Sequence, residues 1–197
     1  QGSIFLLGLE GKRGAKDDRL PLNTLPANGL KAPSKLEWLT SNTLVAFHAH
    51  TLRVWTIPDE IADEVGTYCE FSSGFKSVFT CTALQTSGNL IAAGDNRGHL
   101  CIFRLSDKSA VEALSSRRLH GREHVNEIRW TNSTTLVSVG NDGRLCHATV
   151  SDDGTVQRGI SIPIADFSGV VRILSKLSTQ GSYCVAGYTG NTLAVVD

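Results

Sequence analysis

The chain has 197 residues, 41% of them hydrophobic, which is enough to bury the core of one medium-sized domain or two small ones. Its 19 basic residues balance 19 acidic residues, so no excess of positive charge points to nucleic acid as the main partner. No apolar run approaches the roughly 18 residues of a membrane-spanning helix, and no charged-then-apolar signal pattern occurs at the start. We therefore expect no membrane partner.

Five cysteines are spread along the chain, none of them in a C-x-x-C pair. They are Cys69, Cys81, Cys101, Cys146 and Cys184. Each lies in or beside an apolar, strand-like run, which is typical of buried, reduced thiols in an intracellular protein. Cys and His residues clustered at zinc-ligand spacing are missing, so the sequence predicts no metal and no cofactor. We expect a cytoplasmic or nuclear location.

Most of the chain has the pattern of β-strands. Residues 2–9, GSIFLLGL, predict a strand, and the polar stretch 11–33, which contains three prolines, predicts a long surface loop. A helical turn is predicted at 58–65, PDEIADEV, with proline where a helix can begin. Elsewhere, short β-branched, aromatic or alternating runs are separated by Gly, Asn, Asp and Ser.

A hairpin pattern recurs along the chain, with an apolar strand, a tight turn and a second apolar strand. It occurs in 41–56, 88–104, 133–149 and 181–197. Near the end of the second strand lie Trp55, Phe103, Ala148 and Val196, at intervals of 48, 45 and 48 residues. Another strand precedes each hairpin, at 35–40, 77–84, 126–131 and 170–175, and a weaker strand follows at 66–71, 113–119 and 156–162. The sequence therefore predicts about four strands in each repeat.

These repeats resemble the WD40-repeat family over most of residues 34–197. LRVWT and LAVVD match the family's third strand, GNDG at 140–143 matches the turn before it, and HVNEIRW at 124–130 matches its first strand. The dipeptide His120-Gly121 stands where the family often has Gly-His. No repeat keeps the family's whole set of His, Ser/Thr, Asp and Trp.

The resemblance implies an all-β fold, a WD40-type β-propeller whose stacked four-stranded blades cover one another's faces. About four blades of the roughly seven usual in the family are expected. A chain that begins with Gln1 and contains no methionine is expected to be part of a longer one. The implied divisions are 1–10 as the last strand of a preceding blade, 11–33 as a loop, 34–72, 73–119 and 120–163 as blades, and 164–197 as a partial blade. The implied structural blade anchors are Trp55, Phe103, Trp130, Asp142 and Asp197.

No constellation of catalytic residues is visible in the sequence, and we expect that the chain is not an enzyme. His48 and His50, in the stretch HAH, share a strand face but have no further ligands nearby in the sequence. Asp95 and Asp142 lie in turns, where a carboxylate caps backbone N–H groups. A nucleophile elbow, a P-loop and a dinucleotide motif are all missing.

A cluster of basic residues between two blades is the candidate partner-binding rim. It consists of Arg117, Arg118, His120, Arg122 and His124. Such a patch could dock an acidic peptide or a phosphate, although a solvated loop between blades can have the same composition. One of His120 and His124 could instead fill the family's structural histidine role, hydrogen-bonded within a blade.

The resemblance implies a non-catalytic scaffold that binds other proteins as a subunit of a multiprotein complex. The stretches GSIFLL and LEWLTSNTLVAFHAHTLRVWTI also resemble the methylosome type of WD-repeat subunit, which presents substrates to a protein arginine methyltransferase. A propeller enzyme or small-ligand binder that uses the central channel is the alternative from another class. Nucleic-acid binding through the basic rim is disfavoured by the zero net charge.

Overall fold

A computed structural model of the chain describes residues 4–6, 23–25, 35–38, 43–57, 67–72, 77–85, 89–106, 110–164, 171–176, 183–187 and 192–196. Every regular element in these ranges is a β-strand. No helix long and apolar enough to cross a membrane occurs in them. The predicted all-β fold class is therefore confirmed for the part of the chain that is described.

The strands form antiparallel sheets in which each strand pairs with the next along the chain. The first sheet comprises β3 (Lys35–Trp38), β4 (Thr43–His48), β5 (Thr51–Thr56) and β6 (Thr67–Ser72). The second comprises β7 (Phe79–Leu84), β8 (Leu90–Asp95), β9 (His99–Ser106) and β10 (Ala110–Arg118). The third comprises β11 (Val125–Trp130), β12 (Thr135–Gly140), β13 (Arg144–Val150) and β14 (Val156–Pro163). The fourth comprises β15 (Val171–Lys176), β16 (Tyr183–Gly187) and β17 (Thr192–Val196).

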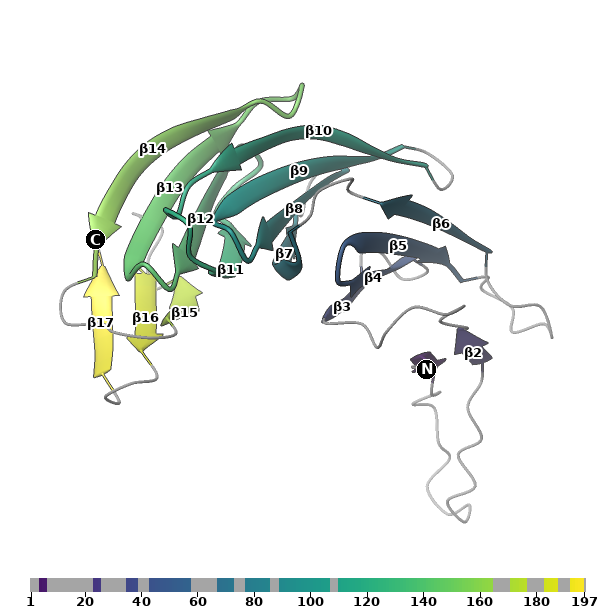
Figure 1. Cartoon of the computed structure of the whole chain (residues 1–197), viewed down its shortest axis with the longest axis horizontal. Helices are drawn as coiled ribbons and strands as arrows, with labels where there is room; N and C mark the ends of the chain where they lie inside the picture. The colour runs from purple at the N-terminus through teal and green to yellow at the C-terminus, as the bar shows by residue number, and fades with distance from the viewer. Residues whose placement is uncertain are drawn as a thin grey trace, which may run out of the picture.

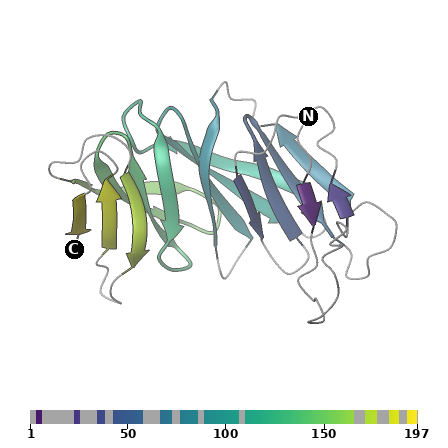
Figure 2. The same cartoon turned by 90° about the horizontal axis from the view of Figure 1, so that it is seen from below.

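The sheets follow one another in chain order along a curved row (Figure 1). The outer side of the row carries β10 and β14, and the inner side carries β7 and β11. Seen from below, the strands of successive sheets stand next to one another (Figure 2). Meandering four-stranded sheets arranged radially in this way are the building plan of a β-propeller.

The N-terminal segment contains a strand pair that the sequence did not predict. β1 (Ile4–Leu6) pairs with β2 (Asn23–Leu25) in a separate two-stranded sheet, and the assignment of 1–10 to a preceding blade stays a prediction. β2 lies inside the range 11–33, so that range is not a loop throughout. A strand of three residues is too short to show alternation, and its pairing partner is distant in sequence. The helical turn predicted at 58–65 lies outside the described residues.

The middle strand β8 is buried on both faces because a neighbouring sheet covers each face. It is buried at every residue, whereas the outer strand β14 is exposed at five of its eight residues. The ring of Phe79 in the second sheet meets Phe47 of the first sheet and Phe103 of its own sheet edge to face, with 5.8 Å between ring centroids in each pair. Such aromatic pairs contribute about 0.5–1.5 kcal/mol beyond the burial of their area. This packing holds neighbouring sheets face to face.

The turn between β8 and β9 binds the loop that leads into the third sheet. Gly98 has a φ of +82°, in the left-handed region that favours glycine. Its carbonyl oxygen accepts hydrogen bonds from the N–H groups of Leu119 and His120, at 2.9 and 3.1 Å. The second and third sheets are therefore joined by backbone contacts as well as by packing.

Replacing Gly98 by alanine is expected to destabilise the fold. A Cβ at this position would lie 1.8 Å from the carbonyl oxygen of His120. The clash and the positive φ together should reduce the free energy of unfolding by more than about 2 kcal/mol. Gly121→Ala is the control, because Gly121 also has a positive φ, +32°, but nothing lies within 4 Å of an added Cβ. Urea unfolding measures both variants, and equal losses would contradict the close contact between turn and loop.

Candidate functional site

Three connections between strands meet at one end of the second and third sheets. They are the β8–β9 turn with its flanking residues (95–99), the β10–β11 loop with the last residue of β10 (118–124), and the β12–β13 turn (141–143). The N–H of Asn141 donates to the carbonyl oxygen of His124 at 2.9 Å, and Gly98 binds the start of the same loop. These three segments form one surface, here called the turn face.

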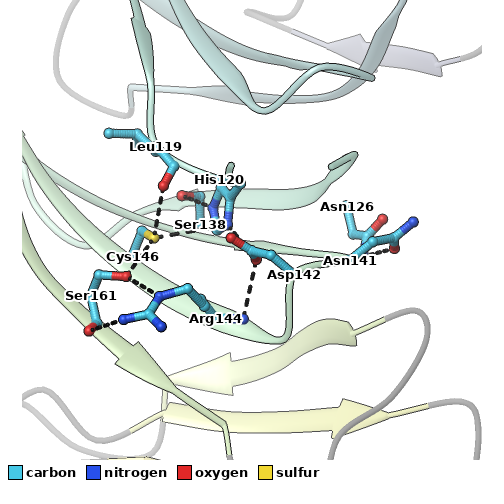
Figure 3. Close-up of polar contacts among 9 residues, drawn as sticks. All are labelled: Leu119, His120, Asn126, Ser138, Asn141, Asp142, Arg144, Cys146 and Ser161. Atoms are coloured by element: carbon cyan, nitrogen blue, oxygen red, sulfur yellow. Dashed lines mark hydrogen bonds and ion pairs between the residues drawn. The ribbon is translucent and has the colours of Figure 1, made fainter. Parts of the chain in front are cut away.

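His120 lies buried at the centre of the turn face (Figure 3). Its Nδ1 is 2.9 Å from Asp142 Oδ1, and its Nε2 is 2.8 Å from Ser138 Oγ. A side chain at Gly140 would prevent this placement, because its Cβ would lie 2.8 Å from the imidazole Nδ1. The imidazole therefore joins the β10–β11 loop to β12 and to the β12–β13 turn.

A thiol lies beside this imidazole (Figure 3). Cys146 Sγ is 3.8 Å from His120 Nδ1 and 3.5 Å from the carbonyl oxygen of Leu119. It also lies 3.2 Å from Ser161 Oγ, which accepts a hydrogen bond from Arg144 Nε at 2.7 Å. Thiol, imidazole and carboxylate in this order are the parts of an activated cysteine nucleophile. Here Cys146 and His120 both have 0% exposure, so the group meets no substrate and serves as an internal clasp.

The charge of His120 follows from its surroundings. Burial by itself lowers the pKa of the imidazole, but hydrogen bonds to Asp142 and Cys146 and the charges of these two groups outweigh burial and raise the pKa to about 9. Burial raises the pKa of the Cys146 thiol, but the hydrogen bond and charge of His120, together with Ser161, lower it below its usual value. At neutral pH, His120 is therefore an imidazolium that faces the Asp142 carboxylate in the interior. Removing one partner of such a pair leaves the other charge uncompensated.

The predicted partner-binding rim contains four exposed residues and one buried residue. The exposed residues are Arg117, Arg118, Arg122 and His124. Arg117 Nη1 donates to the carbonyl oxygen of Val156 at 3.3 Å, which ties β10 to β14. The assignment of His120 to the rim is wrong, because its imidazole is enclosed by its partners on β12 and the β12–β13 turn. His120 instead forms hydrogen bonds within the third sheet, as the alternative reading of the sequence predicts.

The predicted blade anchors lie in different surroundings. Trp55 and Phe103 are buried, and Asp142 is the partner of the imidazole described above. Trp130 is half-buried. Its indole N–H donates to the carbonyl oxygen of Ala83 in β7 at 3.2 Å, which joins the third sheet to the second. Asp197 lies outside the described residues.

The sequence reasoning missed a second histidine with a carboxylate partner. His99 Nδ1 lies 2.9 Å from Asp95 Oδ2, and Asp95 Oδ1 accepts hydrogen bonds from the N–H groups of Arg97 and His99, each at 2.8 Å. Burial raises the pKa of Asp95, but hydrogen bonds from His99, Ser77 and Arg97 lower it below its usual value, so the carboxylate stays charged. The signal that could have revealed the pair is the spacing D-x-x-x-H across a tight turn.

A polar pocket of about 310 Å³ lies at the opposite end of the second and third sheets. It is lined by Gln85, Asn89, Leu90, Arg104, Ser133, Thr134 and Asp152. The Gln85 amide donates to the carbonyl oxygen of Ser133, and Arg104 Nη2 donates to that of Asp152 at 2.7 Å. The strongest hydrogen-bond donors of the pocket are therefore already bonded to other groups of the chain. No group of His, Cys, Asp and Glu side chains that could hold a metal occurs among the described residues.

The His120–Asp142 pair predicts a pH dependence of stability. Because the pKa of His120 is raised from 6.5 to about 9 on folding, the pair contributes fully below about pH 6.5, and its contribution is lost as the pH rises through 9. The free energy of unfolding of the wild type should exceed that of Asp142→Asn most at about pH 6.5 and least at about pH 10, with a change of at most about 3 kcal/mol. Urea unfolding between about pH 6.5 and 10 measures this difference in the free energy of unfolding. A difference that stays constant with pH would contradict the His120–Asp142 ion pair.

No protein-family model matches the chain, and no curated protein matches it in sequence. Among the solved structures that match is that of U3-55K, itself a β-propeller, with a TM-score of 0.60 and 13% sequence identity. The match covers 87% of this chain and 53% of that one, so this chain spans about half the length of the structure that it matches. At such an identity the likeness concerns the fold alone. Together with the stacked, meandering sheets, it shows that this chain has a β-propeller-like all-β fold.

Proposed function

We propose that the chain is a non-catalytic scaffold that binds other proteins as a subunit of a multiprotein complex. The observation that carries this proposal is a contrast on the turn face. The buried His120 fixes the backbone of the loop, and basic side chains on the same face stay exposed. The His120 clasp holds the β10–β11 loop, while Arg118, Arg122 and His124 remain exposed on the same face. Side chains on a pre-organised backbone lose less conformational freedom when a partner binds.

The other candidate functions have less support. For a propeller enzyme, the thiol and imidazole of the clasp would need access to a substrate, and both are buried. Nucleic-acid binding is disfavoured by the zero net charge. The WD40-repeat assignment and the narrower role of presenting substrates to an arginine methyltransferase rest on the sequence resemblance, and no described contact singles out that partner.

A cytoplasmic or nuclear location is part of the proposal. The described thiols are buried and form no disulfide; they are Cys81, Cys101 and Cys146. Reducing compartments keep thiols in this state, which supports the proposal.

Reversing two charges on the turn face is expected to release the protein partner. Arg118→Glu combined with Arg122→Glu leaves the buried clasp in place, because both side chains are exposed. Attraction to an acidic partner surface would become repulsion, so the amount of retained partner should fall at least about tenfold. Affinity capture with the tagged chain, followed by quantitative mass spectrometry, measures the retained partner.

The matched control is Arg158→Glu, which reverses an exposed charge on the outer strand β14. This variant should retain the partner as the wild type does. If the wild type retains no protein in stoichiometric amount, the scaffold proposal fails. If both variants retain the same amount as the wild type, the partner does not dock on the turn face.

A further inference from the structure

The described arginines differ in whether they bind another group of the chain. Four that do so are Arg104 with Glu112 and Asp152, Arg117 with Val156, Arg129 with Glu127, and Arg144 with Ser161. Arg97 and Arg118 are exposed and form no hydrogen bond or ion pair through their guanidinium groups within the described part of the chain. Both belong to the turn face, so their charges remain available there for a ligand.

The topology brings these two arginines to the same histidine. His99 lies directly opposite Arg118 in the β9–β10 ladder. Directly opposed side chains of an antiparallel pair share one face of the sheet, with Cβ atoms about 4.5–5.5 Å apart. Arg97 lies two residues before His99, and the turn that contains it is bound to Leu119, the residue after Arg118, through the carbonyl oxygen of Gly98. The backbone therefore places two arginines and one histidine in one small part of the turn face.

The imidazole of His99 is held in a fixed orientation by Asp95. The distance from His99 Nδ1 to Asp95 Oδ2 is 2.9 Å, and the carboxylate is 2% exposed while the His99 side chain is 27% exposed. The carboxylate is itself held by hydrogen bonds from two backbone N–H groups, those of Arg97 and His99. Because Nδ1 and Nε2 lie on different edges of the ring, the hydrogen bond to Asp95 leaves Nε2 available to a ligand. A binding group that is oriented by its neighbours in this way is pre-organised.

We propose that Arg97, His99 and Arg118 form a phosphoryl-binding site for a phosphoserine or phosphothreonine side chain of a protein partner. The site rests on the scaffold function proposed above and specifies what the partner presents. A guanidinium group binds two phosphoryl oxygens through paired N–H donors, and an imidazole N–H adds a further donor. A bound phosphoryl dianion favours the doubly protonated ring, in which Nδ1 donates to Asp95 and Nε2 donates to the phosphoryl group.

This cluster fits one concentrated charge better than a long polyanion. Glu123 is exposed in the β10–β11 loop, where it would repel an extended acidic segment. Nucleic acid needs many phosphate contacts along a basic track. The chain has zero net charge, and Arg104 and Arg129 are already paired with glutamates. A single phosphoryl group on a protein segment matches the compact site.

Fluorescence anisotropy of the whole chain with three probes tests the proposal. The probes are a degenerate peptide library with a central phosphoserine or phosphothreonine, the same library without phosphate, and an oligouridine RNA. The phosphorylated library should bind at least about tenfold more tightly than the unphosphorylated one, and also more tightly than the RNA. Equal affinity for the two libraries, or tighter binding of the RNA, would overturn the proposal.

Variants then locate the site. Arg97→Ala and Arg118→Ala should each weaken binding of the phosphorylated library about tenfold, while Arg118→Lys, which keeps the charge but loses the paired donors, should fall between Arg118→Ala and the wild type. Arg158→Ala, an exposed arginine on β14, should bind as the wild type does, and a loss equal to that of Arg118→Ala would overturn the assignment. If phosphate has no effect while charge reversal at Arg118 and Arg122 still releases the partner, the scaffold function stands and the phosphoryl site falls.

Discussion

The hydrogen bonds of His120 to Asp142 and Ser138, with the Cys146 thiol beside them, fix the β10–β11 loop against the third sheet. The backbone of the same loop is bound to the second sheet through Gly98. The loop therefore belongs to two sheets at once. The exposed basic side chains of this loop are therefore attached to a backbone that is held on both sides. Without this clasp, a partner would have to order the loop as well as bind it, and the entropy of ordering would weaken binding.

Two histidines of the turn face use the same pairing with a carboxylate to opposite effect. His120 is fully buried, so its partner Asp142 stabilises a charge that solvent never meets. His99 is 27% exposed, so Asp95 orients a ring that still faces outward. The first pair fixes the backbone of the loop, and the second pair orients a partly exposed imidazole beside it. Burial, rather than residue type, decides which histidine is structural and which is available.

The fold could be predicted from the sequence because its signals are local and repeated. Apolar alternation and turn residues mark the strands, and the recurrence of the hairpin places them in sheets. Thus 77–84 and 126–131 coincide closely with β7 and β11. β2 escaped prediction because three residues carry no period, and its pairing with β1 depends on a distant segment.

The site could be predicted only in part, because burial and hydrogen bonding there depend on residues far apart in the sequence. The basic cluster is visible as a run of residues, and three of its members lie exposed on the turn face; they are Arg118, Arg122 and His124. Whether His120 or His124 turns inward depends on Ser138 and Asp142, which belong to other elements. The neighbourhood of Arg97, His99 and Arg118 likewise arises from strand register, which composition does not reveal.

Amide hydrogen exchange in the β10–β11 loop tests the central claim most directly. The amides of Leu119 and His120 donate to Gly98, so they should be protected in the wild type. In Asp142→Asn they should exchange at least about tenfold faster relative to the amides of β4, which lies in the first sheet and reports global unfolding. Unchanged protection of the loop, or an equal acceleration in β4, would contradict the account in which the buried imidazole holds this loop in place.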